Sequence, residues 1–186
     1  MSKSTKLRIF TVGHSSHAFN RFLLLLQKHV IEAVVDVRSY PGSRRHPHFS
    51  RESLSTALGE EGIEYHWLEA LGGNRKRAKD APPSPNRGIV DEAFRYYADY
   101  MATNEFRHGV AGLIEIVGAH RTAIMCAEND YRRCHRQLVS DHLLANDVSV
   151  QHILPDGVLK PHVLTAGVKI VDGTVTYPGQ PTLFDM

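Results

Sequence analysis

Residues 122–136 read TAIMCAENDYRRCHR, and this stretch gives the first indication of the fold class and of a candidate site. Residues 122–125 form an apolar run that predicts a buried strand, and a helical pattern follows over 131–144. The stretch is therefore a crossing from a strand to the N-terminus of a helix. It holds both cysteines of the chain, a glutamate, a histidine and three arginines, which are side chains able to carry chemistry.

The same order of strand and helix recurs along the chain. Residues 33–37 are apolar except for Asp36, which is typical of a strand buried on both faces. Other strands are predicted over 7–12, 63–68, 123–127 and 148–154, and helices over 19–29, 50–59, 91–103 and 106–117. We therefore expect an α/β fold, a three-layer, mostly parallel Rossmann-like sheet of about five strands with flanking helices.

The C-terminal part has a different pattern. Asp172 and Gly173 separate two β-prone runs, over 168–171 and 174–177, and this pair is a strong signal for a two-residue hairpin. We expect a single α/β domain over 1–157, a C-terminal β-hairpin extension packed on it over 158–178, and a flexible tail over 179–186.

Length and composition exclude several classes of protein. A chain of 186 residues, 42% hydrophobic and 23% charged, is typical of one soluble globular domain. The longest apolar cluster is too short to span a bilayer and the N-terminus lacks the apolar core of a signal peptide, so we expect a cytoplasmic protein. In that reducing compartment the two cysteines are predicted to be thiols or ligands rather than a disulfide.

The net charge of +2 excludes a strongly polybasic protein, yet the basic residues are clustered. One cluster contains Arg38, Arg44, Arg45 and Arg51, and a second covers residues 75–79. Such patches suit the phosphate groups of a small ligand or of nucleic acid, although solvated loop charge explains the second cluster equally well.

Polar side chains follow nearly every predicted strand. His14 and Ser15 follow the first, Asp36 and Arg38 the second, and Cys126 and Glu128 the fourth. Ligands of open parallel sheets bind outside the carboxyl ends of the strands, where these loops meet. The sequence therefore predicts one composite site at this edge.

Cys126 is the natural nucleophile of that site, because a thiol at a helix N-terminus near arginines has a lowered pKa. A buried, inert thiol is the alternative. Cys126 and Arg132 also match the C-x5-R pattern of a phosphatase loop, but Glu128 and Asp130 would repel an anion there. Cys134 falls one helical turn before Leu138, which favours packing against the core.

Other roles remain open at this stage. Cys126, Cys134 and His135 could bind a metal ion, completed by His14, but their spacing matches no standard zinc motif. Glu128 could be a general acid or base, or could pair with an arginine. Ser15 could bind an anion or cap the following helix. The residues expected to contact a substrate are His14, Ser15, Asp36, Arg38, Arg44, His135 and Arg136.

Taken together, several separated motifs resemble the bacterial and archaeal family known as domain of unknown function 488. They are Thr11-Val12-Gly13-His14-Ser15, Asp36-Val37-Arg38 with Pro41, Ser43 and Arg44, Phe49-Ser50, Leu71-Gly72-Gly73, Met125-Cys126-Ala127-Glu128, Cys134-His135-Arg136, and Val150 with His152-Ile153. The resemblance spans roughly residues 11–157 and implies a cytoplasmic α/β protein. It implies no particular reaction.

A second resemblance lies in the tail. Residues 180–184, QPTLF, are similar to the pentapeptide with which bacterial proteins bind the sliding clamp, in which Gln180, Leu183 and Phe184 would enter a hydrophobic pocket. Pro181 departs from the usual leucine, and folding back of the tail onto the core is the alternative.

The leading hypothesis is an enzyme that acts on a phosphate-bearing ligand, either a nucleotide or nucleic acid. Arg38, Arg44 and Arg136 would hold the phosphate, and Cys126 and Glu128 would carry the chemistry. One alternative is a non-catalytic DNA-maintenance adaptor recruited to the sliding clamp. The other is a metal-dependent enzyme that uses Cys126, Cys134 and His135. The sequence specifies no cofactor.

Overall fold

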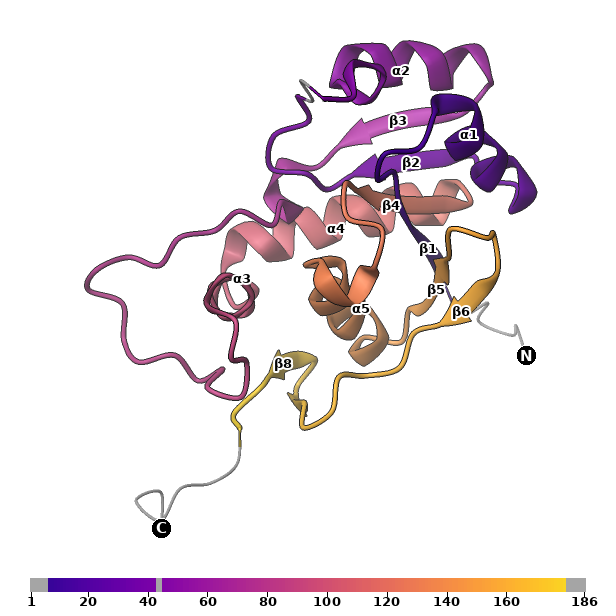
Figure 1. The fold of residues 1–186 in the computed structure, drawn as a ribbon. Coiled ribbons are helices and arrows are strands. Elements are labelled where there is room, and N and C mark those ends of the chain that lie inside the picture. The colour runs from indigo at the N-terminus through magenta and orange to yellow at the C-terminus, as the bar shows by residue number, and fades with distance from the viewer. Residues whose placement is uncertain (1–6, 43–44, 180–186) are drawn as a thin grey trace, which may run out of the picture.

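The computed structural model describes residues 7–42 and 45–179, and its centre is a six-stranded sheet in the order β3-β2-β4-β1-β5-β6 (Figure 1). All pairs are parallel except β5 with β6. The strands are β1 (Arg8–Gly13), β2 (Ala33–Asp36), β3 (Glu64–Trp67), β4 (Thr122–Cys126), β5 (Ser149–Ile153) and β6 (Leu159–Pro161). The helices are α1 (Phe19–Lys28), α2 (Arg51–Glu60), α3 (Glu92–Tyr100), α4 (Asn104–Ala119) and α5 (Arg136–Ala145), with 3-10 turns η1 (Pro47–Phe49), η2 (Glu69–Leu71) and η3 (Tyr131–Arg133).

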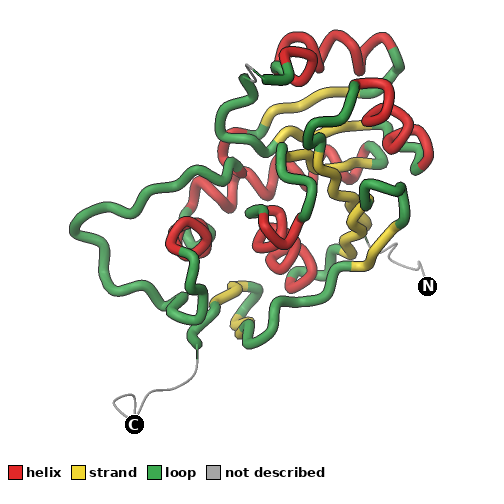
Figure 2. The backbone as a smooth tube through the Cα atoms, in the orientation of Figure 1, coloured by secondary structure: helices red, strands yellow, loops and turns green. Residues whose placement is uncertain are grey.

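Two hydrophobic clusters, one on each face of the sheet, make this a three-layer structure. Successive side chains of a strand point to opposite faces, so Ile9 joins one cluster while Phe10 joins the other. Apolar residues of α1 and α2 fill the cluster around Phe10, and those of α3, α4 and α5 fill the cluster around Ile9. Figure 2 shows the two groups of helices on either side of the strands. The α/β fold and mostly parallel sheet are as the sequence predicts.

The sixth strand was not expected from the sequence. Strand β6 is only three residues long, its residues are exposed, and it pairs antiparallel at the edge of the sheet with β5. A segment this short and exposed has no hydrophobic periodicity to predict it.

The helix expected over 131–144 is interrupted, and this corrects the predicted position of Cys134. Tyr131–Arg133 form a 3-10 turn, Cys134 is extended with φ −131° and ψ 146°, and α5 begins at Arg136. The Asp130 side chain starts the turn by accepting from the backbone N–H of Arg132. Cys134 is buried as predicted, but it does not lie on a helical face one turn before Leu138.

The predicted hairpin forms from β7 (Lys169–Val171) and β8 (Thr174–Thr176), with Asp172 and Gly173 at positive φ in its turn. Val175 and the following Tyr177 are buried in the cluster that contains α5. The Asn146 amide donates to the carbonyl oxygens of His142 and Gly173 and so joins α5 to the turn.

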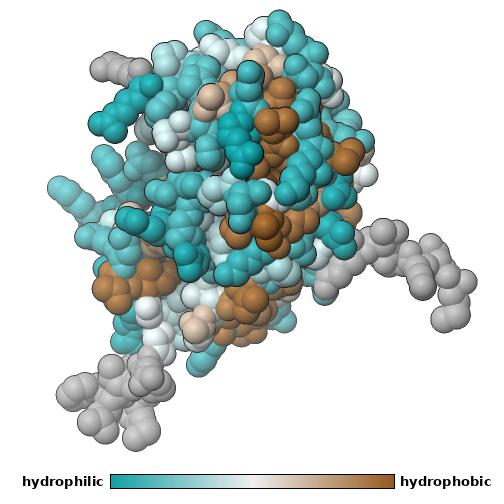
Figure 3. All heavy atoms as spheres, turned by 45° about the vertical axis from the view of Figure 1, so that its right-hand side comes forward, coloured by the Kyte–Doolittle hydropathy of each residue, from teal (hydrophilic) through white to brown (hydrophobic). Residues whose placement is uncertain are grey.

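The molecular surface is mainly hydrophilic on the face in Figure 3, where hydrophobic residues form small separate patches. Among residues 7–42 and 45–179, no helix is both long enough and apolar enough to cross a membrane.

Candidate functional site

The carboxyl ends of β1 and β4 form the switch point of the sheet. These strands are neighbours, with Gly13 opposite Cys126. The chain leaves β1 toward α1 on one face and leaves β4 toward α5 on the other, which is where open α/β sheets bind ligands. The two loops are tied together because the N–H of His14 donates to the Cys126 carbonyl over 3.0 Å. Gly13 allows this approach, since a Cβ there would lie 2.1 Å from the Glu128 carbonyl oxygen.

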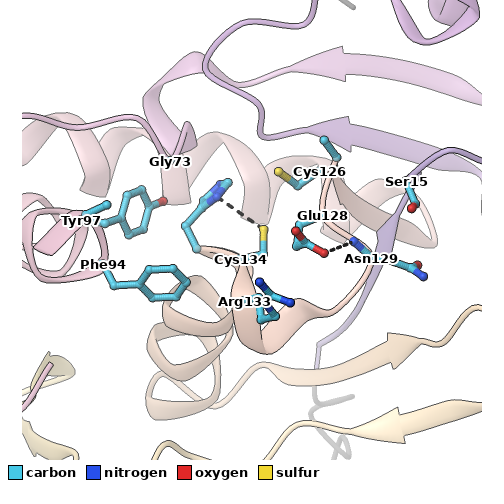
Figure 4. Close-up of a pocket in the computed structure, with 12 residues that line it drawn as sticks. Ser15, Gly73, Phe94, Tyr97, Cys126, Glu128, Asn129, Arg133 and Cys134 are labelled. Carbon is cyan, nitrogen blue, oxygen red and sulfur yellow. Dashed lines mark hydrogen bonds between the residues drawn. The ribbon is translucent and has the colours of Figure 1, made fainter. Parts of the chain in front are cut away.

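A pocket of about 440 Å³ opens at this point (Figure 4). Loops after β1 and β4 form part of its wall, and α3 contributes Phe94 and Tyr97 from the opposite side. In Figure 4, the sulfur atoms of Cys126 and Cys134 point into the same space, and Glu128 and Arg133 lie beside them. The strand-end residues of β4 and the start of α5 therefore share one pocket.

Cys126, Cys134 and His135 form the centre of this pocket, which we call the Cys-Cys-His cluster. One donor atom from each residue lies within 4.8 Å of the other two. The Sγ of Cys134 is 3.6 Å from the Nδ1 of His135. The Nε2 of His135 is 3.0 Å from the Val37 carbonyl oxygen, which can only accept, so Nε2 carries the proton and Nδ1 keeps a lone pair toward Cys134.

A glycine packs against the His135 ring. A Cβ at Gly73 would lie 2.4 Å from Nδ1 and 2.7 Å from Cγ of that ring. A Cβ at the neighbouring Gly72 would lie 2.6 Å from the Ser39 hydroxyl oxygen, so both glycines of the Leu71-Gly72-Gly73 motif are required for close packing. The sequence predicts a loop at Leu71-Gly72-Gly73, but it does not predict that this loop packs against the ring of His135.

The two sulfur atoms have unequal acidity. A hydrogen bond between the thiols, in which Cys126 donates, raises the pKa of Cys126 well above its ordinary value, and burial adds to this. The same hydrogen bond lowers the pKa of Cys134 well below its ordinary value, aided by the charge of Arg136. Cys134, which the sequence assigned to the core, is thus the more acidic of the two thiols.

Asp36, Arg38 and His14 form a separate buried group, which the half-buried Tyr65 also contacts. Arg38 donates to both carboxylate oxygens of Asp36, with Nη2 at 2.5 Å, and is the partner that a buried carboxylate needs. Tyr65 donates to Asp36 over 2.6 Å, and Arg38 Nη1 lies 3.2 Å from the Nε2 of His14. Burial, reinforced by Arg38, lowers the pKa of His14 to about 4. His14, Asp36 and Arg38 are not among the pocket-lining residues.

The remaining candidate residues fall in different places. Ser15 lines the pocket with φ +47° and does not cap α1, whose N-cap is Ala18. Glu128 is exposed at the rim, and its Oε1 accepts from the N–H of Asn129 over 2.9 Å. Arg136 is buried behind Cys134. Arg44 and the tail residues Gln180, Leu183 and Phe184 lie outside the described residues.

Sequence reasoning missed the pocket contributions of Phe94, Tyr97 and Arg133. The two aromatic residues belong to the apolar stripe of α3, where a pocket-facing residue has the same pattern as a core residue. Only the packing of α3 against the start of α5 brings them to the site.

Fold and site together define a three-layer α/β protein with a Cys-Cys-His cluster at the carboxyl edge of a parallel sheet. The chain belongs to the family described as Domain of unknown function DUF488, whose model matches residues 18–143. No curated protein and no solved structure matches the chain.

Proposed function

We propose that this protein is a metal-dependent enzyme in which Cys126, Cys134 and His135 hold the ion. The observation that carries the proposal is the convergence of two sulfur atoms and one imidazole nitrogen within 4.8 Å at a pocket. In a tetrahedral zinc site, bonds of about 2.3 Å to sulfur and about 2.0 Å to nitrogen place these atoms about 3.5 Å apart. The separation of Cys134 Sγ and His135 Nδ1, 3.6 Å, agrees with that geometry.

The surroundings of His135 support the same assignment. Histidines that bind metals usually donate the other ring N–H to a carbonyl or carboxylate, as His135 does to Val37. Two thiolates and an imidazole suit Zn²⁺ better than Mg²⁺ or Ca²⁺, which prefer oxygen ligands. Three protein ligands beside a pocket correspond to a catalytic rather than a structural zinc site, and the ion would supply Lewis acidity there.

Glu128 is the acid or base of the proposed reaction. It follows Cys126 by two residues and lines the same pocket. The bonds from the Asn129 and Asp130 N–H groups are both to Oε1. Within the described part of the chain, Oε2 accepts no hydrogen bond from protein and can exchange a proton with a ligand.

The ligand class remains one with an anionic group such as phosphate. The guanidinium of Arg38 is occupied by Asp36 and His14, and Arg136 is buried. We therefore propose that Arg133, rather than Arg38 or Arg136, contacts the anionic group of the ligand. Arg133 is exposed and lines the pocket. In this proposal Cys126 is a ligand of the ion instead of a nucleophile.

Cobalt titration tests the proposal. Co²⁺ added to protein freed of metal should produce sulfur-to-cobalt charge-transfer absorption and bind with one ion per chain. Cys126→Ser, Cys134→Ser and His135→Gln should each weaken binding at least tenfold. His108→Gln, which changes an exposed histidine on α4, is the matched control and should bind as the wild type does.

Absence of the charge-transfer band in folded wild-type protein, together with zinc-free protein after purification without chelator, would overturn the metal assignment. The two thiols would then remain as a metal-free reactive pair, which rapid alkylation near neutral pH detects. With a substrate found among phosphate esters, Glu128→Gln should lower turnover about a hundredfold or more while Co²⁺ binding persists.

A further inference from the structure

Arg136 is a buried cation with no carboxylate partner in the part of the chain that the structure describes. Its side chain is 1% exposed, and within residues 7–42 and 45–179 it forms no ion pair with Asp or Glu. Its guanidinium donates instead to Cys134 Sγ at 3.4 Å, to Thr11 Oγ1 at 3.4 Å and to the Glu128 carbonyl oxygen. A buried charge needs a counter-charge, and the sulfur of Cys134 is the contacting group that can carry one.

Behind Arg136, a buried chain of hydrogen bonds runs through the protein to Asp141. Thr11 Oγ1 lies 2.8 Å from Nδ1 of His152, whose Nε2 lies 2.9 Å from Nδ1 of His162. The Nε2 of His162 lies 3.0 Å from the Asp141 carboxylate. All four residues beyond Arg136 are buried.

With both imidazoles neutral, the chemistry of the two ends fixes the direction of every bond in this chain of hydrogen bonds. A guanidinium only donates and a carboxylate only accepts. His162 therefore donates from Nε2 to Asp141 and accepts at Nδ1 from His152, which in turn accepts at Nδ1 from the Thr11 hydroxyl. The hydroxyl oxygen is then left to accept from Arg136. Burial keeps His152 neutral, as this arrangement needs, by lowering its pKa to about 3.

The far end is held rigidly. Asp141 also accepts from the Thr165 hydroxyl at 2.6 Å, the Thr165 N–H at 2.8 Å and the Tyr177 hydroxyl at 2.7 Å. The ring of His152 stacks on Tyr131, with centroids 3.4 Å apart and an interplanar angle of 6°. Neither imidazole can rotate without breaking bonds on both sides.

We propose that Thr11, His152, His162 and Asp141 are positioning residues that hold Arg136 against the Cys134 sulfur and thereby set the metal affinity of the Cys-Cys-His cluster. This inference rests on the proposed function, because it concerns a group that contacts one of the proposed ligands. Hydrogen bonds to a ligand from outside the coordination sphere typically change metal affinity by about 10-fold to 100-fold.

A matched pair of variants at Thr11 tests the proposal. Thr11→Val keeps the shape but removes the hydroxyl, and it should raise the Co²⁺ dissociation constant about tenfold and shift the sulfur-to-cobalt band. Thr11→Ser keeps the hydroxyl and should bind Co²⁺ with the affinity of the wild type. A wild-type dissociation constant and band in Thr11→Val would overturn the proposal, as would equal weakening in both variants, because a merely structural role predicts that pattern.

Two further measurements keep the test decisive. His162→Gln interrupts the chain of hydrogen bonds at its link to Asp141, away from the cluster. It should reproduce the effect expected of Thr11→Val and so replaces that variant if Thr11→Val fails to fold. If wild-type protein binds no Co²⁺, the proposed function fails, but the positioning is still measurable. In a Cys126→Ser background, iodoacetamide labels only Cys134, and adding Thr11→Val should slow labelling severalfold. Unchanged labelling would refute the positioning role.

Discussion

The Nε2 of His135 lies 3.0 Å from the carbonyl oxygen of Val37, which directly follows β2. This bond links two parts of the chain separated by 98 residues and selects the ring tautomer that presents Nδ1 to Cys134. The orientation of the imidazole is therefore set before any ligand arrives, so that binding need not include the cost of ordering it.

Replacement of Gly73 should disturb that orientation. In Gly73→Ala the new Cβ would lie 2.4 Å from His135 Nδ1, so the ring must shift from the position in which it donates to Val37. We expect metal affinity at least tenfold weaker and a free energy of unfolding about 1–3 kcal/mol lower, measured by Co²⁺ titration and urea unfolding. Gly118→Ala in α4, where a Cβ meets nothing within 4 Å, is the control. Wild-type affinity in Gly73→Ala would show that the contact is unimportant.

Arg133 should control anion binding at the pocket. Arg133→Ala removes the exposed pocket cation, and we expect inorganic phosphate to bind metal-loaded protein about tenfold more weakly in calorimetry. Arg132→Ala is the neighbouring control, because Arg132 pairs with Asp130 and does not line this pocket. Equal phosphate affinity in both variants would remove Arg133 from the site.

Acidification should destabilise the protein through His152. Burial lowers the pKa of His152 from 6.5 to about 3, so between these values the unfolded chain binds the additional proton. Stability from this group is full above about pH 6.5 and is lost as the pH falls toward 3. Between pH 7 and pH 5 the loss is about 2 kcal/mol. Urea unfolding at both pH values should show a smaller difference in His152→Gln, and an identical difference would contradict the assignment.

The tail prediction is independent of the pocket. If residues 180–184 bind the sliding clamp, immobilised clamp should retain the wild-type chain and lose the double variant Leu183→Ala with Phe184→Ala. Asp185→Ala, just outside the pentapeptide, should bind as well as the wild type. Undiminished retention of the double variant would eliminate the motif.

Local pattern was sufficient for most of the fold. Alternating and continuous apolar runs marked β1 to β5, helical spacing marked the helices, and Asp172-Gly173 marked the hairpin, because these signals depend on neighbours in sequence. The break at Cys134 was missed because apolar spacing does not report the contacts made there, namely the Asp130 side chain that starts the 3-10 turn and the Val37 carbonyl that accepts from His135. The helical spacing of apolar residues continues across Cys134, so it predicted one uninterrupted helix over 131–144.

Strand order and strand-end residues were enough to identify the edge of the sheet that carries polar groups, because parallel strands bring His14, Asp36 and Cys126 to the same edge. The separate roles of these residues follow from the three-dimensional packing. Burial and hydrogen bonding joined Asp36 to Arg38, turned Cys134 toward Cys126 and His135, and placed Arg136 behind that sulfur. These roles depend on distances between segments far apart in the chain, which composition and spacing do not contain.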